Sequence, residues 1–167
     1  PKRGDIIVFN SPFSFDEKLV GLRSKPLPNE IYCFTMSFPP MSFIPGLRDQ
    51  ACDAYIKRVV ALPDELVSVN GKGEVFINNK MIYEPYITYK CSESFLNNCG
   101  EFTNIKVPKD HFLVLGDNRA NSKDGRSWPG TFLPKDQIIG RAYFRFWPLK
   151  NFGFLKIKPN INHLSFN

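Results

Sequence analysis

Residues 112–126 have the sequence FLVLGDNRANSKDGR, and they say more about the fold than any other stretch of the chain. Residues 112–115 are a short apolar run, which is typical of a buried strand. The run ends at residues 116–119 (GDNR), a cluster of turn-forming residues that a continuing strand would not contain. The stretch therefore predicts a buried strand that leads into a loop crowded with hydrogen-bonding side chains. A simple solvated loop with a local ion pair between Asp124 and Arg126 is the alternative.

Residues 55–63 (YIKRVVALP) predict a second strand, rich in β-branched residues, with Lys57 near its start. Because neighbours on a strand alternate between faces, Lys57 shares a face with Tyr55 and Val59. A lysine among apolar neighbours loses hydration of its charged form, so its pKa falls and the neutral amine can act as a base. A fall of ~2 to 3 units corresponds to roughly 3 to 4 kcal/mol, which requires burial or a nearby cation. The alternative is a lysine that extends its ammonium group into water.

Together with residues 3–9 (RGDIIVF), these stretches resemble three boxes of the type I signal peptidases. In that family the boxes are Arg-Gly-Asp-Ile-Val-Val-Phe, Tyr-Val/Ile-Lys-Arg-Val-x-Gly-Leu-Pro-Gly-Asp and Gly-Asp-Asn-Arg-x-Asn-Ser-x-Asp-Ser-Arg. The counterparts here are residues 3–9, 55–65 and 116–126, in the same order, and residues 128–142 resemble the family's closing strand region. The resemblance implies a mainly β fold: an antiparallel sheet or barrel that forms the catalytic domain, with a smaller β insertion. It also implies a serine/lysine-dyad endopeptidase.

The resemblance assigns roles to individual residues. Lys57 matches the general base, and Ser122 matches the hydroxyl that orients it. The residues that match the structural support of the site are Asp117, Asn118, Arg119, Asp124 and Arg126. For the substrate, the strands around Ile6 and Tyr55 are the expected contacts. The resemblance implies no cofactor and no metal.

The same resemblance implies the partners and the location. The substrates would be signal peptides of secretory preproteins, and the catalytic domain would lie on the extracytoplasmic face of the bacterial cytoplasmic membrane. The net charge of +6 favours contact with acidic lipid headgroups over nucleic acid, because the cations are scattered along the chain. No stretch approaches the ~20 apolar residues of a membrane helix.

Departures from the family pattern concern the turn after the lysine strand and the nucleophile. Residues 61–65 are ALPDE, so both glycines of that turn are replaced, and residue 125 is glycine where the family has serine. The family's catalytic serine lies in a Ser-Met-x-Pro box before the Arg-Gly-Asp box, but no serine precedes Arg3. Ser37, in residues 35–40 (TMSFPP), lies after that box, which disfavours it as a substitute. We therefore expect the chain to lack its nucleophile and to be inactive on its own.

The rest of the chain predicts one domain with two insertions. We expect a catalytic β core from residues 1–83 and 104–149, a polar insertion loop at 84–103 and a tail at 150–167. Within the core, residues 10–30 predict a loop, residues 66–83 a three-stranded meander and residues 138–148 the last core strand.

An apolar insertion is expected at residues 31–52. Residues 31–47 contain no charge but carry prolines, which favours a pair of buried strands. A loop that dips into the bilayer interface is the alternative.

The four cysteines provide evidence about the compartment. Cys33 with Cys52 brackets the uncharged run, and Cys91 with Cys99 brackets a polar loop, so two local disulfides are the expected arrangement. Disulfides persist on the oxidising side of a membrane, whereas four free thiols would indicate a reducing one.

Two functions of other classes stay open. A non-catalytic relative of the same fold could act as an assembly or binding factor, for example in pilus biogenesis. A basic β-barrel that binds nucleic acid is disfavoured, because basic and aromatic residues form no common stripe.

Overall fold

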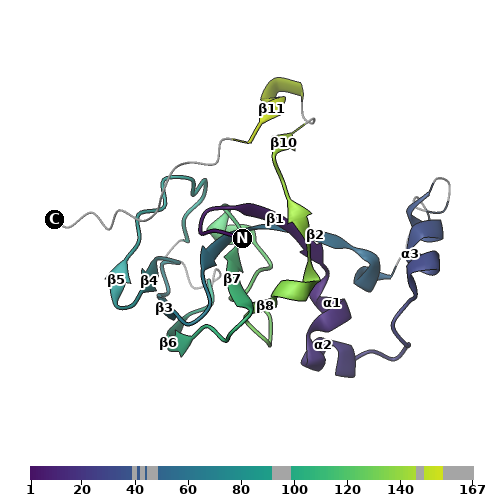
Figure 1. Cartoon of the computed structure of the whole chain (residues 1–167), viewed down its shortest axis with the longest axis horizontal. Helices are drawn as coiled ribbons and strands as arrows, with labels where there is room; N and C mark the ends of the chain where they lie inside the picture. The colour runs from purple at the N-terminus through teal and green to yellow at the C-terminus, as the bar shows by residue number, and fades with distance from the viewer. Residues whose placement is uncertain (39–40, 42–43, 45–48, 92–98, 146–148, 156–167) are drawn as a thin grey trace.

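The computed structural model describes residues 1–38, 41, 44, 49–91, 99–145 and 149–155. Within these residues the chain is mainly β, with antiparallel sheets and a few short helices (Figure 1), so the predicted fold class is confirmed. No helix among the described residues is both long and apolar enough to cross a membrane.

A five-stranded sheet brings the three sequence boxes side by side. Its strand order is β8-β7-β2-β1-β9, and every pairing is antiparallel. The long strand β2 lies at the centre, so Lys57 is paired with Ile7 on one side, while the next residue, Arg58, is paired with Leu115 on the other. The strands are β1 (Ile6–Asn10), β2 (Ala54–Ala61), β7 (His111–Leu115), β8 (Leu133–Pro134) and β9 (Ile138–Arg141).

A four-stranded sheet with the order β5-β4-β3-β6 contains the predicted meander. The strand β6 was not predicted, because residues 102 and 103 were assigned to the polar insertion. Four of its five residues are exposed, so the sequence has no apolar alternation to indicate a strand. The strands are β3 (Leu66–Val69), β4 (Val75–Ile77), β5 (Lys80–Met81) and β6 (Phe102–Lys106).

Two apolar clusters fix the sheets. One packs Ile7 and Phe9 of β1 against Val59, Val114 and Trp128 beneath the five-stranded sheet. The second is shared by the two sheets, and its fully buried members include Val60, Val67, Val75, Val107 and Leu113. Apolar side chains therefore pack on both faces of the five-stranded sheet.

Three short helices replace the loop and the strand pair predicted between β1 and β2. They are α1 (Pro12–Phe15), α2 (Glu17–Gly21) and α3 (Glu30–Ser37). Each begins at a polar residue whose side chain accepts backbone N–H groups: Ser11, Asp16 and Asn29. These capping residues, together with the prolines, resemble loop signals when only the sequence is considered. The prolines at 39, 40 and 45 lie outside the described residues.

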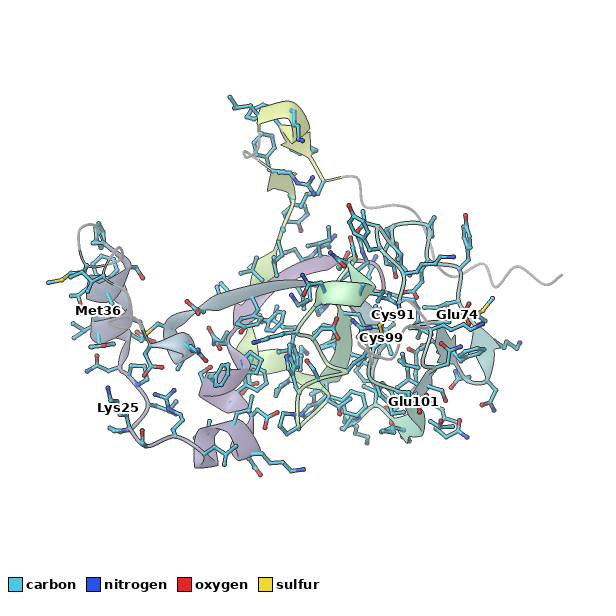
Figure 2. All side chains as sticks on the ribbon, turned by 180° about the vertical axis from the view of Figure 1, so that it is seen from behind. Lys25, Met36, Glu74, Cys91, Cys99 and Glu101 are labelled. Carbon is cyan, nitrogen blue, oxygen red and sulfur yellow. A yellow bond between two sulfur atoms is a disulfide. The ribbon has the colours of Figure 1, made fainter. Side chains whose placement is uncertain are left out.

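Helix α3 lies apart from the sheets, at the right-hand side of the view in Figure 1. None of its residues is buried, and Met36 on this helix lies at the opposite end of the molecule from Cys91 and Cys99 (Figure 2). The disulfide Cys33–Cys52 joins α3 to the segment before β2. Nearby, Arg23 and Asp49 form a two-bond ion pair with N–O distances of 2.7 and 3.0 Å.

The C-terminal part differs from the single strand and the tail that were predicted. Strand β9 ends at Arg141, and β10 (Phe144–Arg145) instead pairs with β11 (Gly153–Phe154) in a hairpin that projects from the body (Figure 1). The ring of Phe144 packs on Phe152 and Phe154 at centroid distances of 4.9 and 5.3 Å. Such contacts between separated aromatic residues leave no periodic signal in the sequence. Residues 156–167 of the predicted tail lie outside the described residues.

The tethering of α3 leads to a first prediction. Replacing Cys33 and Cys52 by serine should release α3, because the helix buries no side chain that could hold it in place. We expect a loss of about 3 kcal/mol from a loop of this length. In hydrogen exchange, amides of residues 30–37 should lose protection while those of β1, β2 and β7 keep it. Slow exchange of α3 in the double variant would contradict this account, and serine at Cys91 and Cys99 is the matched control.

Candidate active site

A cleft of about 430 Å³ lies where β1, β2, the turn after β7 and the C-terminal hairpin approach one another. Strand β2 contributes Lys57 and Arg58 to its wall, and the turn contributes Gly116 and Asp117. Its other lining residues are Ile6, Ile56, Ala142, Phe144, Arg145 and Leu155. The cleft therefore combines apolar walls with a small number of charged groups, as binding sites usually do.

Lys57 is half-buried in this cleft. Its amine lies 5.7 Å from the centre of the Tyr55 ring, which confirms that the two side chains share a face of β2. Burial lowers the pKa of Lys57, and the charges of Asp124 and Asp117 oppose that shift without cancelling it. A larger fraction of the amine is therefore neutral than for a lysine in water, and a neutral amine can accept a proton.

Ser122 lies directly below the turn and has an unusual hydroxyl. Among the described residues, its Oγ is the one buried side-chain oxygen or nitrogen that has no hydrogen-bond partner. It packs so closely on Gly116 that a Cβ added to that glycine would lie 2.1 Å from Oγ. Gly116 also lines the cleft beside Lys57, so the structure brings both predicted residues to this turn. No hydrogen bond joins them in the conformation described here.

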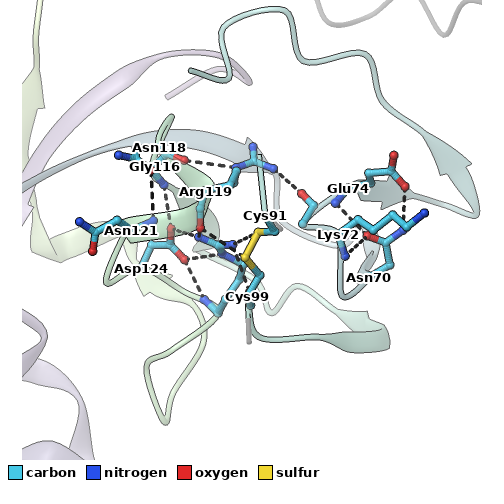
Figure 3. Close-up of a disulfide and its surroundings, with 12 residues drawn as sticks. Asn70, Lys72, Glu74, Cys91, Cys99, Gly116, Asn118, Arg119, Asn121 and Asp124 are labelled. Atoms are coloured by element: carbon cyan, nitrogen blue, oxygen red, sulfur yellow. Dashed lines mark hydrogen bonds and ion pairs between the residues drawn. A yellow bond between two sulfur atoms is a disulfide. The ribbon is translucent and has the colours of Figure 1, made fainter. Parts of the chain in front are cut away.

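Asp124 and Arg126 form the predicted ion pair, and both side chains are buried (Figure 3). The Asp124 carboxylate accepts two hydrogen bonds of 2.9 Å from the Arg126 guanidinium and one of 2.9 Å from the Gly116 N–H. Burial alone would raise the pKa of Asp124, but the hydrogen bonds and charge of Arg126 outweigh it, and the pKa is lowered. The pair therefore remains charged and holds the two ends of the loop together.

Arg58 and Asp117 form a second ion pair at the cleft wall. Two hydrogen bonds of 2.9 and 2.7 Å join them, and Arg58 also donates to the Gly4 carbonyl at 2.8 Å. Burial opposes the charge of Arg58, yet the bonds to Asp117 raise its pKa. The sequence predicts Asp117 as a site residue but not Arg58. The available signal was its position next to Lys57 in the same box.

Arg119 and Asn118 complete the support predicted for the loop. Arg119 forms a buried ion pair with Glu84, with side chains 1% and 3% exposed, and donates to the Gly116 carbonyl at 3.2 Å. Asn118 caps the short 3₁₀ turn that follows by accepting the Asn121 N–H. Glu84 was not predicted, because it lies 35 residues before Arg119 in a segment with no recognisable pattern.

The remaining predicted residues are divided between the cleft and other places. Ile6 lines the cleft, whereas Tyr55 packs on Phe9 with a centroid distance of 6.1 Å and is not among the lining residues. Ser37 is exposed on α3, where its hydroxyl donates to the Cys33 carbonyl, so it has no place in the cleft.

Both expected disulfides are present, Cys33–Cys52 and Cys91–Cys99. The second packs behind the loop, where the Arg126 guanidinium lies 3.5 Å from the Cys91 sulfur (Figure 3).

Comparison with known proteins places this chain in a family. The sequence profile described as "Signal peptidase, peptidase S26" matches residues 1–147. A signal peptidase I from Leptolyngbya laminosa is 36% identical over 160 residues, which is 96% of this chain and 60% of that protein. A probable signal peptidase I-2 from Synechocystis sp. is 43% identical over 103 residues, which is 62% of this chain and 43% of that protein. The matches thus span about half the length of these relatives.

A solved structure supports the fold. The crystal structure of a signal peptidase I from Enterococcus faecalis matches with a TM-score of 0.50 and 23% identity, over 84% of this chain and 95% of that one. At this level of identity, the similarity supports the fold alone. With the profile matching most of the chain, the conclusion is direct: this chain belongs to the signal peptidase family, peptidase S26.

Proposed function

We propose that the chain is the catalytic domain of a signal peptidase I-type serine endopeptidase, in which Lys57 is the general base and Ser122 orients its amine. One observation carries the proposal: a half-buried amine with a lowered pKa lines the cleft beside the turn that covers a buried, unpartnered hydroxyl. A hydrogen bond with the Lys57 amine would supply the partner that Ser122 Oγ lacks. This would align the amine toward the cleft.

The reaction would be hydrolysis of a peptide bond through an acyl-enzyme. Lys57 Nζ takes the proton from a serine hydroxyl as that oxygen attacks the peptide carbonyl, and then gives the proton to the leaving amine. The same amine next removes a proton from the water that hydrolyses the ester. In the family pattern the attacking serine belongs to a Ser-Met-x-Pro box, a sequence that residues 1–167 do not contain, so a test of cleavage requires a protein that has this box together with these residues.

The substrates would be signal peptides of exported preproteins, and the domain would act on the extracytoplasmic side of the membrane. Two disulfides support an oxidising compartment. The net charge of +6 suits a surface of acidic lipid headgroups.

The base assignment predicts the effect of removing the amine. In a protein that contains these residues together with the family's serine box, Lys57→Met should reduce kcat/KM for a signal-peptide substrate by at least ~10²- to 10⁴-fold, because the carboxylate in the cleft wall, Asp117, already accepts from Arg58 with both of its oxygens. The fold should persist, since methionine fills a similar volume. Cleavage at an undiminished rate would refute the role of Lys57, and cleavage without the serine box would refute an external nucleophile.

The lowered pKa of Lys57 also predicts a pH profile. Below that pKa the amine is protonated and cannot act as a base, so kcat/KM should rise with pH on its acid limb. The midpoint should lie below ~10.4, the ordinary pKa of lysine, because burial favours the neutral form. The comparison is a variant in which another general base replaces Lys57. If its kcat/KM has the same acid limb, Lys57 does not determine that limb.

The close packing of Ser122 on Gly116 predicts how adding a methyl group at residue 116 affects activity. Gly116→Ala places a Cβ 2.1 Å from Ser122 Oγ, so the Ser122 side chain must shift from its present position. We expect kcat/KM to fall roughly 10- to 100-fold, since small misplacements of a catalytic group have effects of this size. Gly140→Ala is the matched control, because an added Cβ on this strand meets no atom within 4 Å. Equal activity of both variants would exclude a close role for Ser122.

A further inference from the structure

Residues 84–89, here called the strap, run alongside the turn that carries Asp117. The Thr88 N–H donates to the Asp117 carbonyl at 3.0 Å, and the Arg119 N–H donates to the Tyr89 carbonyl at 2.9 Å. The strap therefore binds the turn through its backbone. The Thr88 hydroxyl adds a hydrogen bond of 3.2 Å to the same Asp117 carbonyl, whereas the side chains of Tyr86 and Glu84 contact the charged groups behind the cleft.

Tyr86 in the strap covers the guanidinium of Arg58. The Arg58 Cζ lies 4.1 Å from the centre of the Tyr86 ring, within the range in which a cation and a ring face attract each other. The Tyr86 hydroxyl donates to Glu84 at 2.5 Å, and Glu84 is itself held by the buried Arg119. The ring is thus fixed at one end by an ion pair and presents its face to Arg58.

The position of Arg58 matters because of Asp117. Arg58 holds both oxygens of the Asp117 carboxylate, and Asp117 is one of two carboxylates whose charge acts on Lys57. The other, Asp124, is held by Arg126. Across the cleft, Arg145 of the C-terminal hairpin adds a cation. Of the two other cations that line the cleft, Lys57 and Arg145, Lys57 is already subject to the charge of Asp117, so a carboxylate released from Arg58 could pair with it.

We propose that Tyr86 and Glu84 are positioning residues of the Lys57 site: the Tyr86 ring holds the Arg58 guanidinium on Asp117, and so keeps that carboxylate from pairing with the Lys57 amine. The inference rests on the proposed role of Lys57 as a base, and it extends that role to residues outside the three sequence boxes. Neither residue touches the reacting atoms.

The test measures the Lys57 amine in the 167-residue chain itself, by an NMR titration of the ¹³Cε-labelled lysine side chains, with Lys57→Met to assign the signal. Tyr86→Leu removes the ring face, so Asp117 should turn toward Lys57 and raise its pKa by about one unit. Tyr86→Phe keeps the face and should cause a smaller rise. Tyr83→Leu is the matched control, because this neighbouring ring is 69% exposed and should leave the titration unchanged.

A double variant separates this mechanism from a general loosening of the site. In the Asp117→Asn background the competing carboxylate is absent, so Tyr86→Leu should no longer raise the pKa of Lys57. The same rise with and without the Asp117 carboxylate would overturn the proposal, as would a titration of Tyr86→Leu that matches the unmodified chain. If Tyr86→Leu does not fold, Tyr86→Met, which also lacks the ring face, provides the same comparison.

Activity then distinguishes the two levels of the argument. In the protein with the serine box, Tyr86→Leu should move the acid limb of kcat/KM to higher pH while activity at the alkaline plateau is largely retained. If Lys57→Met abolishes cleavage but Tyr86→Leu leaves the limb in place, only the positioning role fails. If Lys57→Met remains active, the proposed function itself fails.

Discussion

The Asp124 carboxylate has no solvent exposure, and a buried charge is tolerated only when its partners are in place. Its partners are the guanidinium of Arg126 and the N–H of Gly116, which lie at opposite ends of one loop. This requirement fixes the loop to a single shape. Because Gly116 lines the cleft and Ser122 packs beneath it, the same requirement also sets the relation between the loop and Lys57.

Buried ion pairs are not a general source of stability, since the cost of removing two charges from water can exceed their attraction. Two buried pairs, Asp124 with Arg126 and Arg119 with Glu84, hold the loop beside this cleft, and a partly exposed pair, Arg58 with Asp117, lies in its wall. Their common effect is geometric. Each arginine takes up the charge of one carboxylate, so that Lys57 is exposed mainly to the effect of burial. In a cleft with the same carboxylates and fewer guanidinium groups, the carboxylates would raise the pKa of the lysine further.

The sequence allows a site residue to be predicted when the residue lies within a short motif together with its partners. Lys57, Ser122 and the Asp124–Arg126 pair lie in compact motifs, and the order of those motifs indicated the sheet. Glu84 and Tyr86 could not be found in this way, because their partners Arg119 and Arg58 are distant in the chain and the strap has no apolar period. The helices between β1 and β2 were missed for a different reason. Ser11, Asp16 and Asn29 are helix caps whose composition is the same as that of a turn.

The strands β1 and β2 are paired as far as Asn10 and Ala54. The segment between these two residues contains α3 and lies outside the sheet. Arg23 and Asp49 join the outgoing and returning segments a second time further out. None of the described residues between Arg23 and Asp49 belongs to the two apolar clusters that hold the sheets. The lysine strand therefore keeps its register whatever this outer appendage contains. The segment between Arg23 and Asp49 could therefore change in length or sequence during evolution without altering the geometry around Lys57.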